Sequence, residues 1–196
     1  MPASPFLEEL RRATRAAHQA LDARSGVDAE VTRDEYIALL RGSLTAVELV
    51  EPALLGFTRA GNEPSRAACL RADLVALGAA RLDLPEHPPI AELATEAGAV
   101  GATYVVEGSA LGGMVMSRLV DAALGLEGRA QSYLRYRGDR TGEAWRRCVG
   151  ELSAWGGTAS TERRRSACAA ACAVFALYDS ALTNAGALRA RAPNVG

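Results

Sequence analysis

The sequence predicts an all-α protein that folds as a single compact helical domain over residues 1–196. Its apolar residues are mostly Ala and Leu, while Ile occurs only at Ile37 and Ile90, and this composition favours helix over strand. Capping residues, prolines and glycines recur at the ends of segments with helical apolar spacing, and no segment alternates with the period of a strand. At 49% hydrophobic residues, the chain can bury a sizeable core within one domain.

The charged residues argue against nucleic acid as a partner and against binding to a membrane surface. Arg supplies all 22 basic residues and Asp and Glu supply 23, so the net charge is -1 and the chain has no overall positive field. The sequence does not begin with a basic segment followed by an apolar run, so we expect a cytoplasmic protein. The four cysteines lack metal-ligand spacing and are expected to be reduced and internal: Cys69, Cys148, Cys168 and Cys172.

Local signals predict three helices in the first 80 residues. Ser4-Pro5 is typical of a helix start, and the helix that follows has apolar residues along one face. The capping box Thr32-Arg33-Asp34-Glu35 opens a second helix that continues toward Leu54. Pro64-Ser65 begins a third helix that stops near Gly78. The face of the first helix consists of Leu7, Leu10, Thr14, Ala17 and Leu21.

A proline-rich stretch and a glycine-rich helix occupy the middle of the chain. Residues 82–89 contain Pro85, Pro88 and Pro89 and are predicted to form a loop. From Ile90 the helical pattern resumes and continues to about residue 124, with a disturbance at residues 108–113. The apolar run within this helix is expected to be buried rather than to span a membrane, because Glu107 lies in its middle.

Two further helices are predicted toward the C-terminal end. Thr141 is expected to cap a helix that continues through Trp155 and is closed by Gly156-Gly157. Ser160 or Thr161 opens the last helix, which extends to about residue 184.

His18 is the candidate ligand of the first helix. It projects about 20 degrees from Leu7, so the periodicity places it on the apolar face, pointing inward. Arg15 and Arg11 lie one and two turns earlier, and a neutral imidazole flanked by guanidinium groups complements a ligand with a metal centre and carboxylates, such as heme. Asp22, one turn later, is spaced to accept a hydrogen bond from the other ring nitrogen. A histidine that only packs in the core is the alternative at this point.

Three glycines, Gly108, Gly112 and Gly113, interrupt the helix that is predicted to end near residue 124. Each glycine inside a helix costs about 1 kcal/mol relative to Ala, so packing or function has to compensate. One interpretation is tight packing between helices. The other is a kinked helix whose backbone lies over a flat ligand and leaves room for a small molecule such as O2.

Two motifs, in this order, resemble the heme oxygenase family. They are Leu10-Arg-Arg-Ala-Thr-Arg-Ala-Ala-His18 and Tyr104-Val-Val-Glu-Gly-Ser-Ala-Leu-Gly-Gly113, followed by Trp145 and Ala173-Val-Phe175. The Glu-Gly-Ser-x-Leu-Gly-Gly form is similar to the bacterial branch that supplies biliverdin to bacteriophytochromes. The resemblance covers essentially the whole chain and implies the helical fold of heme oxygenase with a glycine-kinked distal helix.

The resemblance also implies roles for individual residues. His18 would be the proximal iron ligand, and Gly108, Ser109 and Gly112 would be the catalytic residues of the distal helix. Many family members have Asp at the position of Ser109, where it organises distal water, although the bacterial branch commonly lacks it too. The implied heme contacts are Arg11 and Arg15 at the propionates, Thr14 on the same helix, Gly113 on the distal helix, Tyr133 and Arg137 on the propionate side, and Phe175 in the pocket wall.

The activity implied by the resemblance is oxidative cleavage of heme to biliverdin, with release of CO and ferrous iron. Heme would be both substrate and prosthetic group, and O2 would be the oxidant. The sequence contains no nucleotide-binding, flavin or iron-sulfur motif, so electrons would come from an external donor such as ferredoxin or a reductase. A bacteriophytochrome would be the acceptor of the biliverdin.

Two other functions stay open on the sequence alone. A heme-binding carrier or sensor of the same fold would hold heme without degrading it, and Ser109 is the residue that favours this alternative. A non-heme helical enzyme, thiaminase-like or di-iron, would need a catalytic cysteine in a polar pocket or inward Glu-x-x-His ligands, and neither pattern is evident.

Overall fold

The computed structural model describes residues 4–24, 30–54, 64–80 and 89–188. Helices make up most of these residues, and no strand occurs among them, so the predicted all-α class is confirmed. The α-helices are α1 (Pro5–Arg24), α2 (Arg33–Leu54), α3 (Arg66–Ala76), α4 (Glu96–Leu124), α5 (Thr141–Thr158) and α6 (Thr161–Asn184), and the short 3-10 helices are η1 (Ala91–Ala94) and η2 (Gly138–Arg140).

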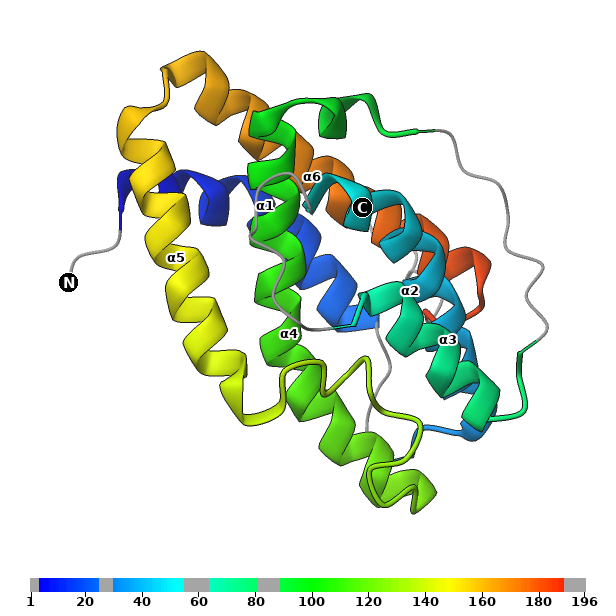
Figure 1. Cartoon of the computed structure of the whole chain (residues 1–196). Coiled ribbons are helices and arrows are strands. Elements are labelled where there is room, and N and C mark those ends of the chain that lie inside the picture. Colours follow the sequence, from blue (N-terminus) through cyan, green and yellow to red (C-terminus); the bar gives the residue numbers. More distant parts are fainter. Residues whose placement is uncertain (1–3, 25–29, 55–63, 81–88, 189–196) are drawn as a thin grey trace.

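α6 is the central helix of the fold. It packs against α1, α2 and α4, while α5 packs against α4 and α1, and α3 packs against α2 (Figure 1). α1 and α4 make little contact with each other and are held in place through α5 and α6. α1, which carries His18, and α4, which carries the glycines, therefore pack against the same two helices and hardly against each other.

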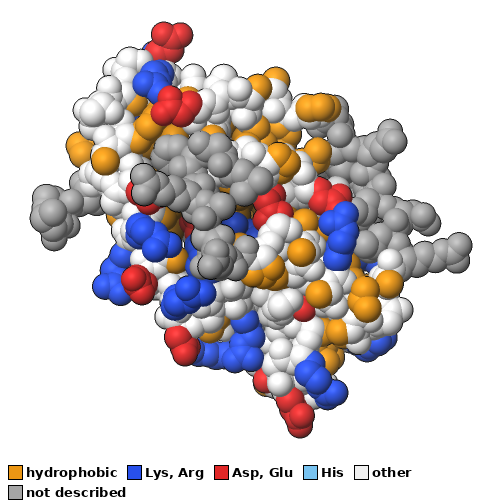
Figure 2. Space-filling view, in the orientation of Figure 1, with side chains coloured by type: hydrophobic (Ala, Val, Ile, Leu, Met, Phe, Trp, Pro, Cys, Tyr) orange, Lys and Arg blue, Asp and Glu red, His pale blue; other side chains and the backbone are white. Residues whose placement is uncertain are grey.

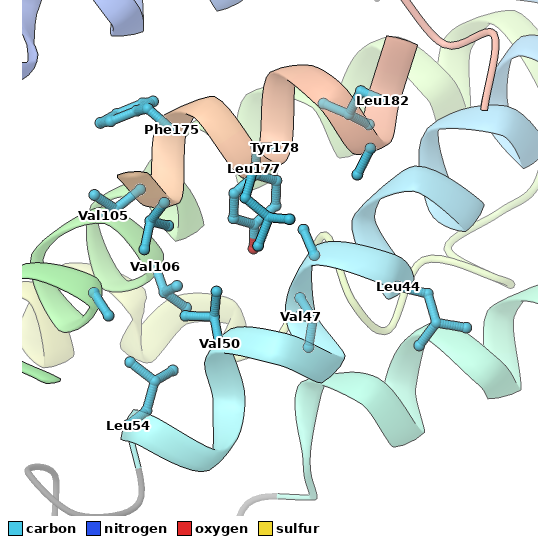
Figure 3. Packing of buried hydrophobic residues seen from close by; sticks show 14 of the residues in the cluster. Leu44, Val47, Val50, Leu54, Val105, Val106, Phe175, Leu177, Tyr178 and Leu182 are labelled. Atoms are coloured by element: carbon cyan, nitrogen blue, oxygen red, sulfur yellow. The ribbon is translucent and has the colours of Figure 1, made fainter. Parts of the chain in front are cut away.

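The centre of the core lies between α2, α4 and α6, where aliphatic side chains from the three helices meet (Figure 3). Val47 and Val50 of α2 lie near Val106 of α4 and Tyr178 of α6 in this region. Close approach of α4 to α6 depends on Gly101, because a methyl group there would collide with the backbone of α6. The first half of α4 is thus fixed in the core by packing.

Most predicted helix starts are confirmed by their caps. The Thr32 backbone N–H donates to Glu35 Oε2 at 2.8 Å, and the Glu35 N–H donates back to the Thr32 hydroxyl at 3.3 Å, which completes the capping box. Ser65 and Ser160 each accept a backbone hydrogen bond as N-cap residues of α3 and α6. These signals are local in the sequence, so they could be identified without the fold.

The start of α4 differs from the prediction. A 3-10 turn follows Ile90, and the helix begins only at Glu96, where the Thr95 hydroxyl accepts a hydrogen bond from Gly98 N–H at 3.0 Å. The helix then continues without interruption to Leu124, so the kink expected at residues 108–113 stays a prediction. The loop predicted at residues 82–89 lies, except for its last residue, outside the described residues.

The boundaries of α5 also differ from the prediction. Thr141 is the first residue of the helix and not its cap, since its hydroxyl donates to the Gly138 carbonyl at 2.7 Å. Gly156-Gly157 does not end the helix, which continues to Thr158. A side chain at Gly156 would collide with Phe6 of α1, so this glycine serves close packing of two helices.

The surface carries charges of both signs, which intermingle on the face shown in Figure 2. Two helices, α4 and α6, are long and apolar enough to cross a membrane by length and composition, but half of each apolar window is buried within the protein.

All four cysteines are free, and Cys69 and Cys148 are buried while Cys168 and Cys172 are half-buried.

Candidate functional site

The imidazole of His18 is held by a carboxylate on the next turn of α1. Its Nδ1 lies 2.8 Å from Asp22 Oδ2, which is the contact expected from the spacing of the two residues. The ring also packs edge-on against Phe175 of α6, with 5.6 Å between the ring centroids. Asp22 thus orients the ring through Nδ1, and Nε2 is the nitrogen that is left for a ligand.

His18 is not buried, contrary to the prediction that it points inward. Its side chain is 59% exposed, because the buried residues of α1 all lie in the first half of the helix and end at Thr14. Ala17 and Leu21, which continue the apolar face, are only partly buried. The second half of α1 therefore has an apolar edge that the described residues leave partly uncovered.

The other predicted residues of α1 fall into two groups. Arg11 and Arg15 are exposed and follow the same stripe as His18, and Arg11 donates to Glu8 Oε1 at 2.7 Å. Thr14 is buried, and its hydroxyl donates to the Leu10 carbonyl at 2.8 Å. Guanidinium groups are thus available on the His18 stripe, whereas the Thr14 hydroxyl is engaged within the helix.

One face of α4 is built from glycines and exposed aliphatic residues. Space beyond Gly112 is open, with no atom within 4 Å of the position that a Cβ would take. Leu111 and Val115, adjacent on the same face, are 41% and 58% exposed. Gly108 borders Trp145 of α5, whose ring would be 3.5 Å from an added Cβ. This face presents an apolar surface, and none of Gly108, Leu111, Gly112 and Val115 is acidic or basic.

Gly113 lies off this face, and Ser109 lies at its edge. A Cβ at Gly113 would be 2.7 Å from the Leu134 carbonyl oxygen, so this glycine allows close approach of the segment that follows α4. Ser109 is exposed, and its hydroxyl donates to the Val106 carbonyl at 2.9 Å. The Ser109 oxygen can still accept a hydrogen bond, but its proton is engaged within the helix.

Tyr133 and Arg137 interact with the α3 side of the molecule and with α4. The Tyr133 backbone N–H donates to Asp73 Oδ2 at 2.9 Å, and burial of its phenol, beside Tyr178, raises its pKa. Arg137 donates to Glu107 Oε2 and, at 3.4 Å, to Oε1. The structure therefore packs His18 against Phe175 of α6 and places it on one stripe of α1 with Arg11 and Arg15, and it pairs Tyr133 and Arg137 with other partners.

Sequence reasoning missed the partners of Glu107 and the aliphatic residues of the α4 face. Arg66 donates to Glu107 from the first turn of α3, at 2.7 Å, although 41 residues separate the two. Leu111 and Val115 have the spacing of ordinary core residues, and only their exposure distinguishes them. No group of three or more His, Cys, Asp or Glu side chains that could hold a metal ion by themselves occurs among the described residues.

Comparison with solved structures identifies the fold of the chain. Neither a protein-family model nor a curated protein matches the chain. The heme oxygenase of Neisseria meningitidis, solved with NO and with CO bound, is 24% identical, with a TM-score of 0.76 over 97% of this chain and 98% of that one. The heme oxygenase of Leptospira interrogans is 18% identical, with a TM-score of 0.72 over 91% and 98%.

A third heme oxygenase, from the cyanobacterium Synechocystis and solved in complex with heme, is 16% identical, with a TM-score of 0.65 over 91% of both chains. Each likeness extends over nearly the full length of both proteins. The chain therefore has the heme oxygenase fold.

Proposed function

We propose that this protein is a heme oxygenase that binds heme through His18. The observation that carries the proposal is the geometry of His18, whose Nδ1 is bound to Asp22 on a half-covered stretch of α1. A metal-ligating histidine commonly donates its other ring N–H to a carboxylate in this way. The heme oxygenase fold supports the same conclusion independently.

The residues present fit heme in three respects. The partly uncovered apolar edge of α1 and the apolar face of α4 suit the two sides of a macrocycle. Arg11 and Arg15 are exposed beside His18, where their guanidinium groups can pair with propionates once Arg11 exchanges its bond to Glu8. Phe175 limits the space beside the imidazole and supports its orientation.

Bound heme would be the substrate and would supply the iron that activates O2. The chain's part is to bind and orient it and to leave the distal side without an acid or base side chain. Gly108 and Gly112 present backbone there, and Ser109 can only accept a hydrogen bond from water while its own proton is bound to Val106. Protons would therefore arrive through water rather than from a side chain of α4.

The products in this proposal are biliverdin, CO and ferrous iron, formed in the cytoplasm. An external donor, ferredoxin or a reductase, would supply electrons, and a bacteriophytochrome would accept the biliverdin. Exposed arginines near this edge other than the proposed heme contacts Arg11 and Arg15, such as Arg12, are the proposed docking groups for the donor. Substituting them should slow turnover with a protein donor and spare turnover with ascorbate, and an equal loss with both would exclude this docking edge.

Hemin titration of the wild type and of His18→Ala, followed by product analysis with ascorbate under O2, tests the proposal. We expect the wild type to give a Soret spectrum of a histidine-ligated heme and then bile pigment. His18→Ala should lose that spectrum, and added imidazole should restore it in part. Gln19→Ala, an exposed substitution on the same helix, is the control. Unchanged iron ligation in His18→Ala would refute the site.

A carrier or sensor is the second candidate, favoured by Ser109 at the position where many heme oxygenases have Asp. It makes the opposite prediction in the same experiment. A carrier would keep its Soret band during incubation with ascorbate or ferredoxin under O2 and would yield no bile pigment, while His18→Ala would still lose ligation.

A further inference from the structure

A buried ionic cluster lies directly beside the glycine stretch of α4. Glu107, 4% exposed, accepts hydrogen bonds from Arg66 on one side and Arg137 on the other. The guanidinium carbons of Arg66 and Arg137 lie 4.3 and 5.4 Å from the ring centroid of Tyr136, and the Tyr136 hydroxyl donates to the Pro64 carbonyl at 2.8 Å. The cluster joins the start of α3, the middle of α4 and the segment after α4.

The same segment touches α4 a second time. Leu134, three residues before Arg137, places its carbonyl so close to Gly113 that no side chain fits there. Arg137 and Leu134 thus hold α4 at Glu107 and at Gly113, which are the two ends of the glycine stretch. We call residues 131–137 the bracket segment.

The bracket segment is itself anchored on α3. Buried Asp73 of α3 accepts hydrogen bonds from the backbone N–H groups of Ser132 and Tyr133, both at 2.9 Å, and from the Ser132 hydroxyl at 2.7 Å. Buried Gln131 donates to Asp121 of α4 at 2.9 Å. The segment is therefore fixed to two helices by its own hydrogen bonds.

We infer that Glu107 is a positioning residue, which with the bracket segment sets where the backbone of residues 108–113 lies over the bound ligand. The need for such a device follows from the composition of the stretch. Glycines are poor helix formers, and this face of the stretch is bordered by Trp145 at Gly108 but is open beyond Gly112. The contacts of Arg137 with Glu107 and of Leu134 with Gly113, which we call the clamp, lie on the opposite side of α4. They then determine how far the helix lies from the ligand and how it is rotated about its axis.

The inference rests on the proposed function only for its consequence. If residues 108–113 contact heme, the position of their backbone decides which meso carbon of the heme is oxidised. Loosening the clamp should therefore relax the choice of carbon before it abolishes binding. The mechanical part, that Glu107 holds residues 108–113 in place, applies to the protein without heme and can be measured there.

Hydrogen exchange of the heme-free protein tests the mechanical part. Glu107→Gln keeps the shape of the side chain and removes the charge that both arginines bind. We expect backbone amides of residues 108–113 to exchange at least about tenfold faster than in the wild type, with amides of residues 97–103 unchanged. Glu96→Gln is the matched control, because Glu96 lies on the same helix and pairs with Arg163 in an exposed position. Unchanged exchange at residues 108–113 in a folded Glu107→Gln protein would overturn the inference.

Product analysis tests the consequence. The wild type should give one predominant biliverdin isomer, Glu96→Gln the same isomer, and Glu107→Gln a mixture. Arg137→Lys, which keeps the cation, should retain more of the wild-type preference than Arg137→Met, and this pair serves if Glu107→Gln does not fold. A single unchanged isomer from Arg137→Met would contradict the inference. If the wild type makes no bile pigment, the proposed function fails while the exchange result still decides the role of the clamp.

Discussion

At the scale of single residues, Asp22 determines what His18 can do. The carboxylate binds Nδ1, which fixes the ring and makes Nε2 the basic nitrogen. Asp22→Asn removes the charge and keeps a weaker acceptor, so we expect hemin affinity to fall about 10- to 100-fold, the range seen when a partner of a metal-ligating histidine is removed. Optical titration with hemin measures it. Glu151→Gln, an exposed substitution on α5, should leave the affinity unchanged, and an equal affinity in Asp22→Asn would show that Asp22 does not orient the ligand.

Cys148 makes the stability of the protein depend on pH in the alkaline range. Burial raises the pKa of its thiol to about 12 from the ordinary value of 9.0. The unfolded thiol ionises above pH 9 while the folded one does not, so the stabilisation is complete below pH 9 and is lost progressively as the pH rises toward 12. At pH 10.5 this thiol should lower the free energy of unfolding by about 2 kcal/mol relative to pH 8.

Urea denaturation of the wild type and of Cys148→Ala at these two pH values measures the contribution of the thiol. The variant should start from a lower stability at pH 8 because it loses packing, but its decline between pH 8 and pH 10.5 should be smaller. An equal decline in both proteins would mean that the thiol is accessible to hydroxide in the folded state.

At the scale of secondary-structure elements, α4 contains two neighbouring glycines with opposite environments. Gly112→Ala adds a methyl group in open space, so helix propensity should stabilise the heme-free protein by about 1 kcal/mol. Gly113→Ala drives a methyl group to 2.7 Å from the Leu134 carbonyl, and such overpacking should destabilise the protein by about 1 to 3 kcal/mol.

Urea denaturation and hemin titration of the two variants together separate function from packing. Gly112→Ala should be more stable than the wild type and yet bind hemin more weakly, because its methyl group enters the space over the proposed ligand. Stronger hemin binding by Gly112→Ala, or equal stability of the two variants, would contradict the description of this face.

The elements also show which boundaries local sequence could predict. The capping box at Thr32 and the N-cap Ser160 were predictable, because the side chain and the backbone group that it binds are three residues apart. The end of α5 was not, because the position of Gly156 inside the helix depends on Phe6, which is distant in the sequence. A glycine pair ends a helix or allows close packing, and only the neighbouring helix decides between the two.

At the scale of the whole molecule, the fold class and the contact between His18 and Asp22 could be predicted, and partners distant in the sequence could not. Spacing on one helix predicted the contact between His18 and Asp22. Arg66 and Arg137 are 41 and 30 residues from Glu107, so no periodicity connects them. The exposure of His18 was equally unpredictable, because it depends on how α1 packs on α6. The buried residues of α1 end at Thr14, although Phe175 and Asp179 of α6 still contact His18 and Arg24.

That incomplete cover leads to a prediction for the whole molecule. If heme fills the uncovered edge of α1, binding should stabilise the folded protein by mass action, by about 2.7 kcal/mol when free hemin is 100-fold above its Kd. For a domain of this size, that is an increase in Tm of about 5 to 10 °C. Differential scanning calorimetry with and without hemin measures the shift.

The distribution of the stabilisation within the molecule is as informative as its size. Amides in the second half of α1 and in residues 108–113 should gain protection from hydrogen exchange when hemin binds, because the ligand would contact these two helices and tie them together directly. Amides of α3, which packs against α2 and contacts α4 through Arg66 and Glu107, should gain less than either of these regions. His18→Ala should show a smaller Tm shift and lose the added protection in α1 first. A uniform gain across all helices, or a gain in α3 equal to that in α1, would place the hemin elsewhere on the molecule.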